Sequence, residues 1–285
     1  MSNLIQAVPL GYCDQQKTSS IAIQSDPVFT ADDDAMWAKL YSKQINNLQD
    51  KACSFFLENF KKLDLSAHRV PKFKEVSERL QDYTGWQVVP VTGLLPFESY
   101  FQLLAQRKFP SSIFLRSKHE EHLSKDPDTF HELFGHCTML VSLDYADFMQ
   151  AYAQFSLSVS ERDRPLCARL MWFTTETGLI NTPEGLRIFG SSIVSSYSES
   201  IYCLSSDQPV RKAFDCVAML REPYRADKLQ TVYYVLQEIQ QVYDLLDHTT
   251  DIHQAIALAR SLGEFAPKFL VEHNKYTNIG HCVTL

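Results

Sequence analysis

The sequence predicts a mainly α-helical protein that folds as one domain. Apolar residues recur at steps of three and four along most of the chain, the period of helices that bury one face. Stretches with the pattern of strands are few and short. The 285 residues are 45% hydrophobic and 21% charged, enough to bury one large core, and no repeat or Gly/Ser-rich linker divides them. We therefore expect residues 1–285 to form a single domain.

The N-terminal third begins with an arm and continues with helices. Residues 1–30 are expected to be irregular, because their apolar residues follow no period and prolines and a glycine interrupt them. Acidic residues 32–34 then cap a helical pattern that extends to Phe56. A second helix is predicted from Pro71 through Leu80, ending before Gly85.

The middle of the chain predicts two extended pieces and two helices. The string WQVVPV, Trp86 to Val91, has the β-branched content of a short strand, and Ile113 to Arg116 predicts another. A helix is expected over Phe97 to Arg107, and Asp128 is placed to cap a later one.

The remaining segments again favour helices. The turn signal NTPEG interrupts them, and residues 272–285 form a polar tail. The predicted helices cover Tyr145 to Leu157, Leu166 to Thr175, Ile193 to Leu204, Thr231 to Leu246 and Ile252 to Leu262.

Charge and composition exclude several classes of partner. A net charge of -7 and no long Lys/Arg run argue against nucleic acid. No uninterrupted apolar stretch reaches the length of about 18 residues that a membrane span needs. Seven cysteines with no C-x-x-C pair argue against a disulfide framework, so we expect a cytoplasmic protein.

The stretch DPDTFHELFGHCTML, which begins at Asp126, is the strongest candidate for a metal site. Its histidines, His131 and His136, are five residues apart, whereas the H-E-x-x-H zinc motif uses a step of four. Five residues of a regular helix turn the second side chain about 140° from the first. Shared ligation therefore requires a distortion of the helix, and Gly135 lies where it could occur.

Glu176 is the candidate third ligand. It closes the apolar helix RLMWFTTE, where an unpaired carboxylate would be costly to bury. The alternative is an ion pair of Glu176 with Arg169 or Arg187. Two imidazoles and one carboxylate leave coordination positions open and suit Fe(II) oxygenase chemistry, whereas structural zinc prefers a closed tetrahedral site. His119 and His122, in KHEEH, are a weaker candidate pair that fits a solvated face.

Several separated motifs resemble those of the pterin-dependent aromatic amino acid hydroxylases, and most closely their short, single-domain bacterial phenylalanine 4-hydroxylases. The resemblance spans residues 85–234 and implies a mostly helical catalytic fold, a basket with a few short strands around a non-haem iron. It also implies that His131, His136 and Glu176 bind Fe(II). The motifs are WQVVPVTGLLP, FLR, PDTFHELFGH, WFTTETGLI and SSYSESIYCLS.

The resemblance implies roles for further residues, position by position. Arg116 matches the arginine that binds the substrate carboxylate, a task that suits its planar guanidinium. Glu132 matches an acid that orients the pterin near the metal and takes part in catalysis. The other positions matching the amino acid pocket are Ser124, Pro127, Trp172 and Ser195, and those matching the pterin site are Leu95, Phe97 and Tyr100.

The implied reaction uses Fe(II), O2 and a tetrahydropterin to convert L-phenylalanine to L-tyrosine, a step of phenylalanine catabolism and tyrosine biosynthesis. Tryptophan or tyrosine as substrate, a zinc hydrolase with Glu132 as general base, and a non-catalytic helical binding protein are the alternatives. Met171 and Thr177 stand where relatives often carry aromatic residues, so we expect a looser wall beside Trp172. We expect a monomer without a regulatory domain, since residues 1–30 leave no room for one and the tail has no apolar heptads.

Overall fold

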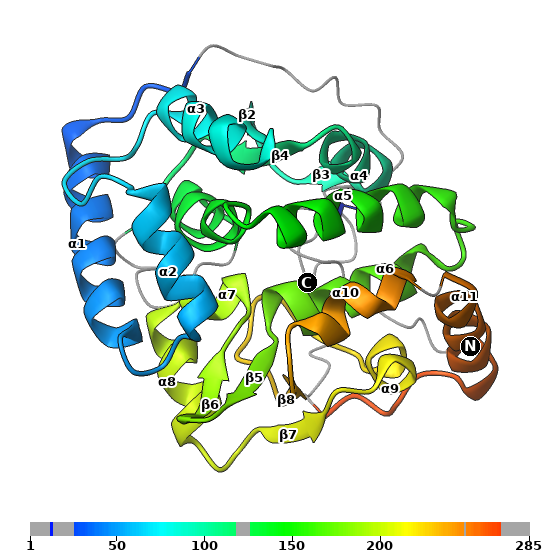
Figure 1. Cartoon of the computed structure of the whole chain (residues 1–285). Coiled ribbons are helices and arrows are strands. Elements are labelled where there is room, and N and C mark those ends of the chain that lie inside the picture. The colour runs from blue at the N-terminus through cyan, green and yellow to red at the C-terminus, as the bar shows by residue number, and fades with distance from the viewer. Residues whose placement is uncertain (1–11, 14–25, 118–125, 248, 269–285) are drawn as a thin grey trace, which may run out of the picture.

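The computed structural model describes residues 12–13, 26–117, 126–247 and 249–268. Helices dominate, which confirms the predicted class (Figure 1). The α-helices are α1 Ala31–Leu48, α2 Ser54–Leu63, α3 Phe73–Thr84, α4 Phe97–Ala105, α5 Leu143–Ser158, α6 Arg164–Met171, α7 Ser191–Val194, α8 Tyr197–Ser205, α9 Cys216–Arg221, α10 Gln240–Asp247 and α11 Thr249–Leu262. Two π-helices are η2 His131–Cys137 and η3 Trp172–Glu176. The strands are β1 Tyr12–Cys13, β2 Gln87–Val91, β3 Leu95–Pro96, β4 Lys108–Ser112, β5 Leu179–Thr182, β6 Gly185–Ile188, β7 Val210–Ala213 and β8 Val232–Leu236.

Two helices, α1 and α2, replace the single helix predicted over residues 32–56. Thr30 caps α1 through a capping box with Asp33, whose backbone N–H donates to the Thr30 hydroxyl at 3.2 Å. Between the two helices the chain pairs with β6, since the Cys53 N–H donates to the Ile188 carbonyl at 2.9 Å and the Ile188 N–H to the Lys51 carbonyl at 2.8 Å. This long-range pairing breaks the helix, so the prediction of one continuous helix is wrong at residues 49–53.

A two-stranded parallel sheet of β2 and β4 follows α3. The second predicted helix and the extended segment at Trp86 to Val91 are confirmed, and Gly85, with a φ of +76°, ends α3 in the left-handed conformation. The strand predicted at Ile113 to Arg116 is wrong, because the strand of this region, β4, ends just before it at Ser112. Pro110 lies inside β4, which a two-stranded sheet tolerates since each strand is an edge.

A four-stranded sheet with the order β6-β5-β8-β7 forms the lower part of the molecule in Figure 1, with α5 above it. The NTPEG turn joins β5 and β6 as an antiparallel hairpin. The helix predicted over Thr231 to Leu246 is wrong in its first half, where β8 lies between β5 and β7. All five residues of β8 are buried, and a short, uniformly apolar run has no period that distinguishes strand from helix.

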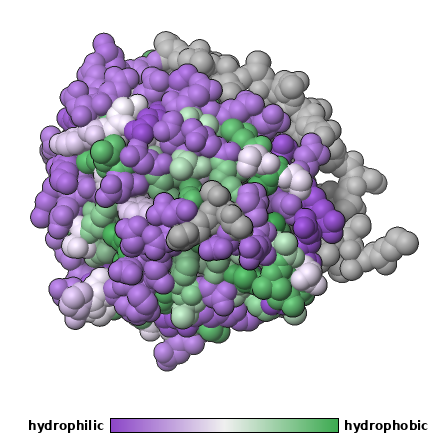
Figure 2. Space-filling view, turned by 45° about the vertical axis from the view of Figure 1, so that its right-hand side comes forward, coloured by the Kyte–Doolittle hydropathy of each residue, from purple (hydrophilic) through white to green (hydrophobic). Residues whose placement is uncertain are grey.

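Both ends of the chain lie mostly outside the described residues. Within the predicted irregular arm, Tyr12 and Cys13 form β1 and pair with Leu95 and Pro96 of β3. The predicted polar tail, residues 272–285, is not among the described residues. On the face shown in Figure 2 hydrophilic residues predominate and apolar ones form separate spots. In the described part of the chain no helix is long and apolar enough to cross a bilayer.

Candidate metal centre

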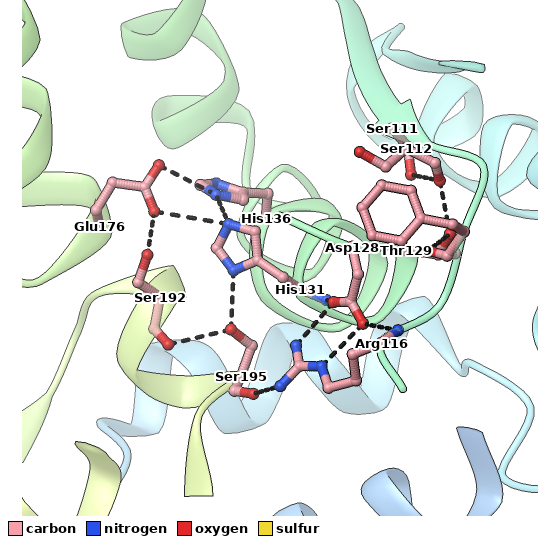
Figure 3. A network of polar contacts seen from close by, with 11 residues as sticks. Ser111, Ser112, Arg116, Asp128, Thr129, His131, His136, Glu176, Ser192 and Ser195 are labelled. Carbon is pink, nitrogen blue, oxygen red and sulfur yellow. Dashed lines mark hydrogen bonds and ion pairs between the residues drawn. The ribbon is translucent and has the colours of Figure 1, made fainter. Parts of the chain in front are cut away.

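The distortion that the five-residue step requires is the π-helix η2. A π-helix bonds residue i to residue i+5, so residues five apart lie one turn apart on the same side. His131 and His136 both point into one space, with their Nε2 atoms 3.0 Å apart (Figure 3). Gly135 allows the backbone of α7 to pack close against η2, because a Cβ atom built on Gly135 would lie 2.8 Å from the Ser191 carbonyl oxygen.

Aromatic packing fixes the opposite side of η2. Phe130 and Phe134 stack with ring centroids 4.7 Å apart, and Trp37 and Phe60 contact them from α1 and α2. On β4, the Phe109 ring stacks on the His136 imidazole at 5.0 Å. These rings are almost fully buried, so the two histidines project from a rigid wall.

Glu176 reaches the same space from the end of η3. The Thr177 N–H donates to the Trp172 carbonyl at 2.9 Å, the five-residue bond of a π-turn. The Glu176 carboxylate lies 3.2 Å from His136 Nε2 and 3.8 Å from His131 Nε2. Candidate ligand atoms of the three residues all lie within 4.8 Å of one another, and each residue is buried.

A chain of hydrogen bonds orients the ligands. The Ser192 hydroxyl donates to Glu176 Oε2 at 2.7 Å, and the Ser195 hydroxyl donates to the Ser192 carbonyl at 3.1 Å. The Ser195 hydroxyl has only one proton, which it donates to the Ser192 carbonyl. The Ser195 oxygen therefore accepts a hydrogen bond from the Nδ1–H of His131, 2.8 Å away. The Nε2 atom of His131 is then unprotonated, and its lone pair points at Glu176 and His136. This is the tautomer that a metal ligand needs.

Electrostatics favour a cation in this space. Burial, and then the neighbouring His136, lower the pKa of His131 to about 3, so its imidazole is neutral at pH 7. Burial alone would raise the pKa of Glu176, but the two histidines and the Ser192 hydroxyl outweigh it and keep the carboxylate ionised. His136 Nδ1 has no hydrogen-bond partner. Two imidazole nitrogens and one anionic oxygen that converge in a buried space fit a divalent metal ion.

The alternative partners of Glu176 lie elsewhere. Arg169 pairs with Glu264 and donates to the Leu220 carbonyl at 3.2 Å, and Arg187 donates to the Leu186 carbonyl at 3.0 Å. His119 and His122 lie outside the described residues. The buried carboxylate of Glu176 therefore contacts the two histidines and Ser192.

A pocket opens beside His131. It brings together Arg116, Pro127, Trp172 and Ser195, all of which the sequence resemblance assigned to the amino acid, whereas Ser124 lies outside the described residues. The complete lining is Arg116, Asp126, Pro127, His131, Trp172, Ser192, Ser195, Ser196, Glu199 and Ala226.

Arg116 is held by Asp128 in a buried ion pair that the sequence did not reveal. Its Nε and Nη2 donate to the two Asp128 oxygens at 2.8 and 2.7 Å, and its Nη1 donates to the Ser195 carbonyl at 3.2 Å (Figure 3). Further N–H groups of the guanidinium stay available for a ligand. Asp128 also accepts from the His131 N–H at 3.0 Å, which confirms the predicted cap and ties the arginine to the helix of the histidines.

Trp172 forms a fixed wall of the pocket. Its ring stacks on Tyr224 at 4.4 Å and its Nε1–H donates to Gln230 Oε1 at 3.1 Å. Thr177 is fully buried, and its hydroxyl donates to the Trp172 carbonyl at 2.8 Å. Thr177 thus ties the end of η3 to Trp172, while the expected loosening of this wall by Met171 and Thr177 stays a prediction.

The residues assigned to the pterin form a separate group. Leu95, Phe97 and Tyr100 are buried at the start of α4 and do not line the pocket beside Arg116. Burial, and then Glu176 and Glu132, raise the pKa of Tyr100. Burial also raises the pKa of Glu132, with Glu176 and Asp128 adding to the effect.

Comparison with known proteins gives a consistent picture. Residues 15–277 match the family model described as biopterin-dependent aromatic amino acid hydroxylase. The chain is 42% identical to a phenylalanine-4-hydroxylase of Chromobacterium violaceum over 76% of this chain and 73% of that protein. The phenylalanine hydroxylase of Legionella pneumophila superposes with a TM-score of 0.81 at 44% identity, covering 85% and 96% of the two chains. A Chromobacterium violaceum structure with bound iron(III) and 7,8-dihydrobiopterin superposes with a TM-score of 0.79 at 38% identity, covering 86% and 88%.

Proposed function

This chain belongs to the biopterin-dependent aromatic amino acid hydroxylases, and we propose that it hydroxylates L-phenylalanine to L-tyrosine with O2 and a tetrahydropterin at an Fe(II) centre. The observation that carries the proposal is the cluster of His131, His136 and Glu176 beside a pocket that contains Arg116 and Trp172. The relatives at about 40% identity are phenylalanine hydroxylases, which supports phenylalanine over tryptophan or tyrosine.

Different residues of the chain bind the metal, orient its ligands and bind the substrate. His131, His136 and Glu176 would hold Fe(II) on one side, and Ser195 and Ser192 fix the orientation of these ligands. When bound, the iron and the pterin supply the activation of O2 that no side chain can provide. Arg116, pre-organised by Asp128, binds the substrate carboxylate, and the rigid Trp172 positions the aromatic ring.

The pterin lies on the α4 side of the metal in this proposal. Leu95, Phe97 and Tyr100 form its apolar side, with the Tyr100 ring available for stacking. Burial raises the pKa of Glu132, and a carboxyl that holds its proton can donate a hydrogen bond to a ring nitrogen or carbonyl of the pterin. Glu132 thereby orients the pterin toward the iron.

The remaining expectations are part of the same proposal. One catalytic domain over residues 1–285 agrees with the family match across 15–277, and we propose that it acts as a monomer on small molecules. A cytoplasmic location is supported by the cysteines of the described segments from residue 26 onward, Cys53, Cys137, Cys167, Cys203 and Cys216, which are all free thiols. Sedimentation of the purified protein measures the oligomeric state.

Product analysis tests the proposed reaction. The iron-loaded enzyme is supplied with tetrahydropterin, O2 and one of three amino acids, and hydroxylated products are separated by chromatography. We expect tyrosine from phenylalanine and much less product from tryptophan or tyrosine. Equal rates with tryptophan would contradict the assignment of phenylalanine as the preferred substrate. Full activity of a zinc-loaded, iron-free sample would contradict the iron-dependent oxygenase reaction.

A further inference from the structure

The pocket beside the metal cluster has a second buried ionisable group opposite in sign to Arg116. Glu199, on α8, lines the pocket and is only 4% exposed. Its Oε1 accepts from the Tyr233 hydroxyl at 2.8 Å and from the Gln230 N–H at 3.3 Å. Within the described segments no residue donates a hydrogen bond to Oε2, and no Lys, Arg or His forms an ion pair with Glu199.

A carboxylate in this environment favours an incoming cation. Burial raises the pKa of Glu199 to about 7, although the bonds from Tyr233 and Gln230 act in the opposite direction. The ionised form is therefore poorly compensated by the protein alone. A positively charged ligand group at Oε2 would supply the missing charge and the missing donor.

The position of Glu199 relative to Arg116 defines the ligand. Arg116 Nη1 contacts the Ser195 carbonyl at 3.2 Å, and Ser195 lines the same pocket as Glu199. Ser196 caps α8 and accepts from the Glu199 N–H at 3.4 Å, which fixes the first turn of this helix. A cation and an anion thus line the same pocket. An α-amino acid carries a carboxylate and an ammonium group on adjacent atoms.

We propose that Glu199 binds the α-ammonium group of the amino acid substrate and so makes the pocket select α-amino acids over aromatic acids that lack the amino group. This inference rests on the proposed function, since it concerns the same pocket. Arg116 and Glu199 then bind the two charges of the zwitterion, and Trp172 contacts its ring.

A purely structural role is the competing explanation, because Glu199 also supports Gln230, which accepts from Trp172. The Glu199→Gln variant separates the two. Its amide oxygen can still accept from Tyr233 and from the Gln230 N–H, while the negative charge toward the pocket is lost. A matched control is Glu222→Gln, which removes a carboxylate that is equally buried, accepts from the Tyr234 hydroxyl at 3.1 Å and does not line the pocket.

The experiment is anaerobic titration calorimetry of the iron-loaded enzyme with L-phenylalanine and with 3-phenylpropionate, which lacks the amino group. The wild type is expected to bind L-phenylalanine about ten to a hundred times more tightly, the ratio that a charge-assisted hydrogen bond gives. Glu199→Gln should bring this ratio of affinities close to one, chiefly by weakening the binding of L-phenylalanine. Glu222→Gln should leave the ratio unchanged.

Three results would overturn the inference. The first is a wild-type ratio near one, which needs no variant and holds even if Glu199→Gln does not fold. The second is an unchanged ratio in Glu199→Gln. The third is an equal loss of affinity for both ligands together with a lowered melting temperature, as a structural role predicts. Tyrosine formation by the wild type is measured in parallel. Its absence would contradict the proposed reaction, while the binding ratio would still decide the role of Glu199.

Discussion

The Asp128→Asn variant is expected to lose folding stability and substrate affinity together, because the Asp128 carboxylate accepts hydrogen bonds from both Arg116 and His131. Its carboxylate accepts two bonds from the Arg116 side chain, one from the Arg116 N–H and one from the His131 N–H. The two side chains are 0% and 2% exposed, so water cannot take over these bonds. An asparagine places an NH2 group against the guanidinium donors and leaves the arginine charge uncompensated.

Breaking one partner of a buried ion pair costs about 3 to 5 kcal/mol, a large part of the roughly 5 to 15 kcal/mol that stabilises a typical domain. The measurement is urea unfolding followed by circular dichroism at pH 7. The control is Glu75→Gln, since Glu75 pairs at 2.9 Å with Arg69, the two side chains are 37% and 42% exposed, and such a surface pair contributes less than about 1 kcal/mol. The KM for phenylalanine should also rise about tenfold in Asp128→Asn, because Arg116 is no longer held in place.

The stability difference between wild type and Asp128→Asn should depend on pH. Burial alone would raise the pKa of Asp128, but the charge of Arg116 and four hydrogen bonds lower it below 3.8. A lowered pKa in the folded state contributes stability that is fully present above the unfolded pKa and is lost as the pH falls through the folded pKa. The difference should therefore be constant above about pH 5 and shrink below pH 3.8. A loss below 1 kcal/mol at pH 7 with an unchanged KM would refute the assigned role of the ion pair.

Four further outcomes are expected. His131→Ala should lose stoichiometric Fe(II) and all tyrosine formation, whereas the exposed His253→Ala should keep both, and wild-type iron content in His131→Ala would refute the ligand assignment. Ser195→Ala should weaken Fe(II) binding about 10 to 100-fold in metal competition titrations, because the tautomer of the ligand histidine is no longer fixed, and an unchanged affinity would contradict this. Arg116→Lys keeps the charge but loses the planar fork, so the KM for phenylalanine should rise about tenfold with iron content unchanged; an unaltered KM would make the residue structural. Glu132→Gln should lower the tyrosine formed per tetrahydropterin consumed, because a misplaced pterin still reacts with O2, and an unchanged ratio would remove its orienting role.

Local signals in the sequence predicted the parts of the fold that local chemistry decides. The end of α3 follows from Gly85, and the need for a distorted helix follows from the five-residue step between His131 and His136. The errors occur where distant segments decide the outcome. The chain between α1 and α2 is held by β6, and β8 is a strand because β5 and β7 lie on either side of it.

The candidate site shows the same division. The resemblance of motifs indicated Arg116, but nothing in the spacing revealed that Asp128, the predicted helix cap, is also its partner in a buried ion pair. Glu199 lies within the recognised motif SSYSESIYCLS, but its place in the pocket appears only when the structure is seen in three dimensions. Ion pairs and pocket walls depend on side-chain directions that residue order does not specify.

The π-helical form of η2 makes this centre sensitive to the length of the chain rather than only to its composition. Removing one residue between His131 and His136 would leave a step of four, which a regular α-helix already places on one side, and the residues after the deletion would keep their rotation because the wider turn has absorbed the extra residue. Inserting a residue would instead give a step of six, which neither an α-turn nor a π-turn places on one side. A deletion in this segment therefore leaves the two imidazoles on one side, whereas an insertion separates them.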